Sequence, residues 1–186
     1  MHPLFRSCTV LCAVLLTACA GTPPSRQPEN LPAFELAGRV AVRYQERGFS
    51  SSLRWKQTDG RDEIWLTAPL GQTIAYLEAD ADGATITGAD QRQYRAASIE
   101  SLTKSAFGWR FPVDGMRYWA FGDAAPGTLP AAVERDAAGR IARLRQDDWR
   151  VTFNYTADAK RPSRLDIAGN DAEIRLVVDS LTRNAP

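Results

Sequence analysis

The stretch that decides the fold is FSSSLRWKQTDGRDEIWL, residues 49–66. Apolar and polar side chains alternate in it with a period of two, which is typical of half-buried β-strands. The pair Asp59-Gly60 in its middle favours the positive φ angles of a two-residue hairpin turn. Counting outward from this turn predicts the cross-strand pairs Thr58–Arg61, Lys56–Glu63, Trp55–Ile64 and Leu53–Leu66. A one-residue slip would scramble the apolar and charged faces, so the pattern specifies one register.

The same alternation continues on both sides of this hairpin. Upstream, one parity holds Phe34, Leu36, Gly38, Val40 and Val42. Downstream, further strands are predicted at 74–79, 84–87, 141–146, 149–155, 164–168 and 174–179. Turn residues recur about every 8 to 12 positions, as they do in an antiparallel meander. We therefore predict a mainly β domain of about ten or eleven antiparallel strands.

Two short segments between residues 98 and 122 break the strand pattern. Ser98 can cap a helix that has on one face Ile99, Leu102 and Ala106. Pro112-Val113 can open a second helix, with helical spacing between Met116, Trp119 and Ala120. Since both helices are amphipathic, we expect them to bury their apolar stripes on the concave face of a curled sheet.

Composition excludes several classes of function. The chain has 186 residues, enough for one domain with appendages. All three cysteines and the single histidine lie within residues 1–19, so the remainder can build neither a Cys/His zinc site nor a thiol or Ser-His-Asp catalytic site. Lys and Arg number 23 and Asp and Glu 22, a balance that argues against nucleic-acid binding. With no GxxxxGK[ST] phosphate loop either, we expect no catalytic residue, metal or cofactor.

The N-terminus carries an export signal. Residues 8–16 form a nine-residue apolar run, too short to cross a bilayer but suited to a signal peptide. The run ends in Leu16-Thr17-Ala18-Cys19, which resembles the bacterial lipobox, in which the cysteine is diacylated, the signal is cut before it and the new amine is acylated. We expect a signal peptide over 1–18, the lipidated Cys19 and a Pro-rich tether over 19–33, and a folded domain over 34–186.

Four segments together resemble the LolB family of outer-membrane lipoprotein receptors: residues 38–57, 66–77, 111–122 and 147–155. They occur in the right order and cover nearly the whole mature domain. The resemblance implies an unclosed half-barrel of roughly eleven antiparallel strands, with helices packed on or plugging a hydrophobic cavity for acyl chains. The family tends to end its last strand in an aromatic residue after an acidic one, whereas here Asp179-Ser180 precede Leu181.

The resemblance also implies a function, a location and partners. It implies a monomeric, non-enzymatic receptor that takes lipoproteins from the periplasmic carrier LolA and incorporates them into the outer membrane. Ala20, rather than an aspartate, follows the lipidated cysteine, which implies anchoring in the outer membrane of a Gram-negative bacterium with the domain facing the periplasm. The position that matches a protruding membrane-insertion residue of the family is Leu70, between turn-forming Pro69 and Gly71.

The acyl-chain cavity is expected to be lined by Val40, Val42, Leu53, Trp55, Ile64, Leu66, Met116 and Trp119. The same pattern fits an ordinary packed core equally well. Two other functions remain open: a lipid-anchored scaffold that binds a protein through its apolar face, and a hydrolase using Asp147, Asp148 or Glu63. Asp147-Asp148 fits a hairpin turn better, and no acid pair sits in an apolar context that would tune its pKa. On the opposite parity, the pattern allows a stack of Arg54 on Trp65. It also allows a basic patch of Arg39, Arg43 and Arg54, although a solvated sheet face explains these arginines more simply.

Overall fold

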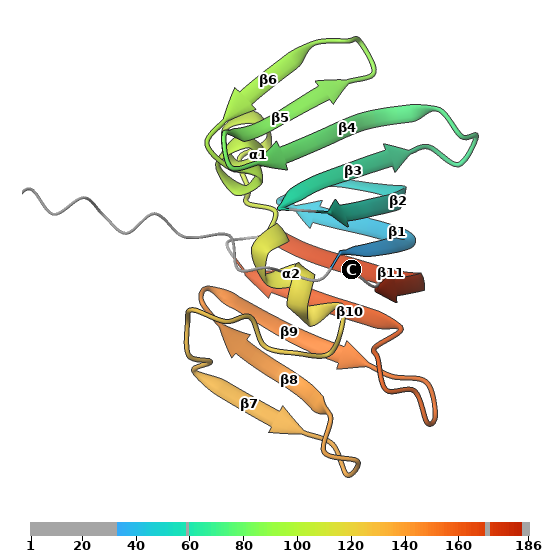
Figure 1. The fold of residues 1–186 in the computed structure, drawn as a ribbon, viewed down its shortest axis with the longest axis vertical. Coiled ribbons are helices and arrows are strands. Elements are labelled where there is room, and N and C mark those ends of the chain that lie inside the picture. The colour runs from blue at the N-terminus through green and yellow to red at the C-terminus, as the bar shows by residue number, and fades with distance from the viewer. Residues whose placement is uncertain (1–32, 59, 170–171, 184–186) are drawn as a thin grey trace, which may run out of the picture.

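The computed structural model describes residues 33–58, 60–169 and 172–183. Eleven strands form one antiparallel sheet in the order β6-β5-β4-β3-β2-β1-β11-β10-β9-β8-β7. The two edge strands, β6 and β7, lie at opposite ends of the molecule and do not pair, so the sheet stays open (Figure 1). The prediction of an unclosed antiparallel half-barrel with two short helices is confirmed.

The elements have the following bounds: β1 Phe34–Tyr44, β2 Arg47–Thr58, β3 Arg61–Thr67, β4 Thr73–Asp80, β5 Gly83–Gly88, β6 Gln93–Ala96, α1 Ile99–Phe107, α2 Val113–Trp119, β7 Ala132–Arg135, β8 Ile141–Gln146, β9 Trp149–Asn154, β10 Arg164–Gly169 and β11 Ala172–Arg183.

The register of the β2–β3 hairpin is the predicted one. Thr58 pairs with Arg61, Trp55 with Ile64 and Leu53 with Leu66. Gly60 has φ +77°, the conformation that its lack of a side chain permits, whereas Asp59 lies outside the described residues. The hairpin therefore turns Leu53, Trp55 and Ile64 to the interior, whereas Lys56 and Glu63 pair on the opposite face.

The pair β1–β11 lies in the middle of the sheet and contains a β-bulge. The register shifts between Ala37 and Gly38, and a Cβ at position 38 would overlap the carbonyl oxygen of Val177. Only glycine fits such a close approach of two backbones. Beyond the bulge Leu181 pairs with Leu36 and packs against the core, so a leucine at this position holds the last strand in place.

Three details differ from the prediction. The edge strands β6 and β7 were not expected, because each has four residues, nearly all exposed, and so lacks the alternating pattern. In α1 the buried side chains are Ile99, Leu102 and Thr103, whereas Ala106 is exposed. The helix turns Thr103 inward because its hydroxyl donates to the Ile99 carbonyl at 3.0 Å and accepts the Phe111 N–H at 2.9 Å.

Both helices lie on the concave face of the sheet, as expected. Ser98 caps α1, its side chain accepting the Ser101 N–H, and the helix packs against β4, β5 and β6. α2 crosses the middle of the molecule and covers the remaining interior (Figure 1). Within the described ranges, no helix has the length and apolar character needed to cross a membrane.

Candidate functional site

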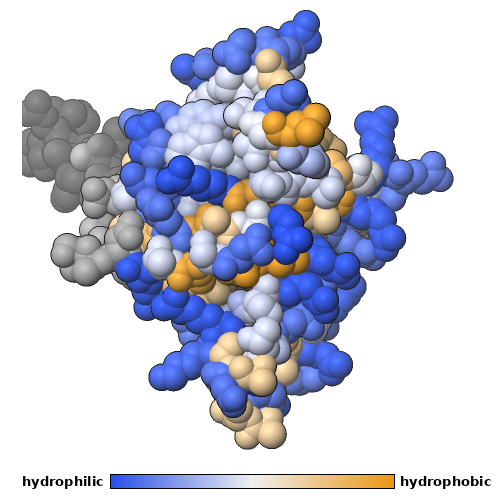
Figure 2. All heavy atoms as spheres, turned by 90° about the vertical axis from the view of Figure 1, so that its right-hand side faces the viewer, coloured by the Kyte–Doolittle hydropathy of each residue, from blue (hydrophilic) through white to orange (hydrophobic). Residues whose placement is uncertain are grey.

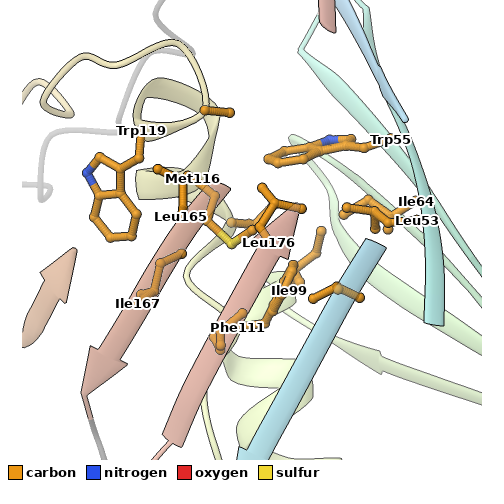
Figure 3. Packing of buried hydrophobic residues seen from close by; sticks show 14 of the residues in the cluster. Leu53, Trp55, Ile64, Ile99, Phe111, Met116, Trp119, Leu165, Ile167 and Leu176 are labelled. Atoms are coloured by element: carbon orange, nitrogen blue, oxygen red, sulfur yellow. The ribbon is translucent and has the colours of Figure 1, made fainter. Parts of the chain in front are cut away.

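The predicted cavity residues lie together between the sheet and the helices. Seven of the eight are buried, and Leu66 is partly buried against them. Side chains of α2 project among those of β2, β10 and β11 (Figure 3). Trp55, Met116 and Trp119 are 0% exposed. A side chain with no accessible area borders no void that admits a water molecule, so around these residues the interior is closed and filled.

The strands of the C-terminal half supply as much of this interior as those of the N-terminal half. The fully buried side chains there include Leu165, Ile167, Ile174 and Leu176. The prediction placed strands at these positions but did not assign them to the cavity. Their period-two spacing was the signal that could have done so.

A buried glutamine attaches α2 and the segment after it to β8. The Gln146 side-chain oxygen accepts the Trp119 indole N–H at 3.1 Å and the Ala125 N–H at 2.9 Å. Its amide nitrogen donates to the carbonyls of Ala125 and Thr128 at 2.6 and 2.8 Å. Because Gln146 is fully buried and satisfied at both ends, it is a firm attachment point for the covering helix.

A second polar attachment joins α2 to β3. The Arg117 guanidinium forms an ion pair with Asp62, which is almost fully buried and also accepts the Trp55 indole N–H at 2.8 Å. Burial raises the pKa of the Asp62 carboxyl, and the charge of Arg117 partly opposes this rise. Sequence reasoning missed this pair. The signal was Asp62 itself, a charged residue on the parity of Ile64.

A glycine in α2 makes room for the tryptophan one turn later. A Cβ at position 115 would overlap ring atoms of the Trp119 indole. Glycine inside a helix is unfavourable by itself, so its presence here reflects the packing of the ring.

Leu70 projects from the tip of the β3–β4 loop, where it is 86% exposed. The loop is braced by two backbone hydrogen bonds of 2.8 Å, from the N–H groups of Ala68 and Gly71 to the carbonyls of Gln72 and Ala68. It extends away from the sheet on the right of Figure 1. On the face that lies on that side, hydrophilic residues predominate and apolar ones reach the surface in a band across the middle (Figure 2).

An aromatic cluster lies where α1 ends near the start of β2. Trp109 is buried and its ring centroid lies 6.4 Å from Phe49, 6.5 Å from Phe107 and 6.0 Å from Phe111. Phe49 and Phe107 are both exposed. Phe49 shares the parity of Leu53 but lies at the beginning of its strand, where α1 and the residues after it cover it only in part.

The outer face of the sheet is charged but locally balanced. Arg39 pairs with Asp179, Arg43 with Glu173 and Arg54 with Glu35, all at 3.7 Å or less. The three arginines therefore do not form a basic patch, and the solvated-face interpretation fits. The predicted stack of Arg54 on Trp65 is present, with 5.7 Å to the ring centroid.

A hollow of about 730 Å³ lies on this outer face, over β1 and β7 to β11. Its lining includes the charged side chains of Arg43, Arg143, Arg150, Asp166 and Glu173. Its charged lining differs from that of the predicted apolar cavity, although Val42 belongs to both.

The carboxylates considered for hydrolysis are not assembled into a site. Asp147 and Asp148 form the turn between β8 and β9, as expected, and Asp148 pairs with Arg110 at 3.0 Å. Glu63 lies on β3 beside the Tyr76 hydroxyl at 2.9 Å. No cluster of three His, Cys, Asp or Glu side chains that could hold a metal ion occurs in the part of the chain that the structure describes.

Fold and site together define an open half-barrel with an apolar interior closed by two helices. The chain belongs to the LolB family, because the model of that family, described as "Outer membrane lipoprotein LolB", matches residues 32–180. Relatives named outer-membrane lipoprotein LolB occur in Cupriavidus metallidurans (36% identity, 88% of this chain and 89% of the relative) and Thiobacillus denitrificans (37%, 89% and 90%). Among solved structures, a LolA superfamily protein from Nitrosomonas europaea matches with 9% identity and a TM-score of 0.47 over 84% of this chain and 88% of that one.

Membership of this family gives the chain its location and its general role. It is an outer-membrane lipoprotein with a role in lipoprotein localisation, and its family is not an enzyme family. The signal peptide, Cys19 and nearly all of the tether, residues 1–32, lie outside the described residues. The lipidation of Cys19, the membrane contact of Leu70 and the acyl-chain binding of the cavity residues stay predictions.

Proposed function

We propose that the domain receives the acyl chains of lipoproteins from the carrier LolA in the space between sheet and helices and releases them into the outer membrane. The observation that supports this most directly is the construction of the interior. An apolar space lined from both halves of the sheet is covered by α2, which polar side chains attach at two points, Gln146 and Asp62. Both attachments are made by side chains, so α2 can move once they break without unpairing any strand of the sheet.

Uptake of a chain requires this cover to shift, because the interior is filled in the closed state. Met116 and Trp119 of α2 occupy the space that an acyl chain would take, with Val40, Val42, Leu53, Trp55, Ile64 and Leu66 as the opposite wall. Each CH₂ group transferred from water into such surroundings contributes about 0.8 kcal/mol. No bond is made or broken, so direction comes from differences in affinity, first between carrier and receptor and then between receptor and bilayer.

Release is assigned to the β3–β4 loop and attachment to Cys19. Lipidation of Cys19 would add three acyl chains, and anchoring of that kind is effectively permanent because one chain alone gives only marginal binding. Leu70 then needs to supply only a local contact with the bilayer. A fully buried leucine gains about 1.5–3 kcal/mol, enough to favour one step of a transfer.

The test is transfer from a loaded carrier. Both helices, all eleven strands and the described core lie within residues 34–183, so the chain from Ala20 onward keeps what holds the fold together. Mixed with lipoprotein-loaded LolA in the absence of ATP, this protein should acquire the lipoprotein, measured by size-exclusion chromatography. A folded protein that leaves the lipoprotein on the carrier would refute the proposal, and binding of a protein partner without acyl chains would favour the scaffold instead.

A further inference from the structure

Among the residues that the structure describes, two side-chain polar atoms are buried without a hydrogen-bond partner. They are the side-chain oxygen of Gln57 on β2 and the Nε of Arg117 on α2. Gln57 is 2% exposed. Buried polar groups are nearly always bonded, and each exception calls for an explanation. Here one atom is an acceptor and the other carries a donor N–H, yet they do not bond to each other.

Both atoms belong to one polar group at the margin of the apolar interior. Gln57 lies directly opposite Asp62 in the β2–β3 register and on the parity of Trp55. The terminal nitrogens of Arg117 are taken by Asp62 and, at 3.0 Å, by Asp114. The charged ends of Arg117 are therefore already paired, and the buried atoms that remain without a partner are one neutral acceptor and one N–H donor.

Other buried polar side chains of the interior do have hydrogen-bond partners, so the two unpaired atoms are not typical of the fold. Gln146 uses both ends of its amide in four hydrogen bonds. Ser51, buried on the same strand and face as Gln57, has its hydroxyl 3.1 Å from the Thr67 carbonyl. The unpaired atoms are confined to the place where the β2–β3 hairpin meets α2.

We propose that Gln57 and Arg117 bind the amide and ester linkages at the head of a triacylated cysteine. This inference rests on the proposed function. An N-acyl amide offers an N–H for the Gln57 oxygen, and amide and ester carbonyls offer acceptors for the Arg117 N–H. The acyl tails would follow the apolar side chains beside this group, starting at Trp55 and Met116.

The chemistry makes Gln57 a specificity determinant. A diacylglycerol phospholipid has ester carbonyls for Arg117 but no N–H next to its acyl carbonyls, so it offers Gln57 no donor at that position. A triacylated lipoprotein satisfies both. Sites that hydrogen-bond a ligand group reject analogues that lack it, because the partner is then left buried and unpaired. The receptor would thereby prefer lipoprotein chains over the phospholipid chains that surround it.

The experiment compares two synthetic lipopeptides that differ only at the acyl-amide nitrogen, which carries a hydrogen in one and a methyl group in the other. One carries N-palmitoyl-S-(dipalmitoylglyceryl)cysteine and the other the same group with its acyl amide N-methylated. Their affinities for the chain from Ala20 onward are measured by displacement of a fluorescent lipopeptide. We expect the N-methylated form to bind about tenfold more weakly, the value of one hydrogen bond.

Variants assign this difference to the two side chains. Gln57→Leu should bind both lipopeptides equally, and it should fold, since it removes a buried unpaired group. Ser51→Ala, the matched control on the same face, should keep the tenfold preference. Arg117→Lys keeps a charge for Asp62 but not the Nε donor, and it should weaken both lipopeptides alike.

The outcomes separate this inference from the function it rests on. Equal binding of both lipopeptides by the unaltered protein, or an undiminished preference in Gln57→Leu, would overturn the assignment of Gln57 and leave the receptor function standing. Binding of neither lipopeptide by the folded protein would overturn both.

Discussion

Replacement of Leu70 by glutamate should separate release of a lipoprotein from its uptake. Leu70 is 86% exposed, so the substitution removes no packing and should change the free energy of unfolding by less than about 0.5 kcal/mol. Nearly the whole side chain is available for contact with a bilayer. Loss of this contact should remove about 2 kcal/mol of favourable binding free energy. At about 1.4 kcal/mol per factor of ten, insertion should slow roughly 30-fold.

The assay follows a fluorescent lipoprotein from the loaded receptor into phospholipid vesicles, with lipopeptide affinity measured in parallel. Leu129 supplies the matched control, since it is 92% exposed in the segment before β7 and should tolerate glutamate without effect. Equal insertion rates for Leu70→Glu and the unaltered protein would refute the reasoning. So would an equal defect in Leu129→Glu, because general surface hydrophobicity would then be the cause.

Three further changes test the attachment of α2 and the electrostatics of the sheet. Gly115→Ala should lower the free energy of unfolding by about 1–3 kcal/mol in urea titrations, because the added Cβ overlaps the Trp119 ring. Alanine is the better helix former, so a gain in stability would contradict the packing described. Gln146→Leu should cost about 2–4 kcal/mol in the same measurement, since it leaves the Trp119 and Ala125 N–H groups buried and unpaired, and an unchanged midpoint would show that the attachment is unimportant. Burial and hydrogen bonding to Glu63 and Glu78 raise the pKa of Tyr76 to about 12. The folded state thus holds this proton more tightly than the unfolded one, stability should fall between about pH 10 and 12, and Tyr76→Phe should make the fall shallower.

The hairpin at residues 49–66 shows why much of the fold could be predicted. A two-residue turn fixes the register, and alternation fixes which side chains face inward, so local sequence is sufficient. The edge strands β6 and β7 could not be found in this way because they bury no face. The same reasoning located the β-sheet wall of the candidate site and the apolar residues of α2.

The polar contacts within the site were beyond local sequence. Asp62 and Arg117 are 55 positions apart, and no periodicity links a residue of a strand to one of a helix. Gln57 and Asp62 nevertheless stood on the apolar parity, and a polar residue in that place is a sign that something must bond to it. Only the three-dimensional arrangement can show whether that partner belongs to the chain or to a ligand.

The short edge strands reduce the risk that this open sheet pairs with other chains. An open sheet ends in unpaired backbone groups that can recruit strands from other chains, and a half-barrel has two such ends. Here each end offers only four residues, with Arg95 on one and Glu134 and Arg135 on the other. Short, charged edges disfavour polymerisation into fibrils. The sheet can thus stay open without offering other chains a long edge on which to add a strand.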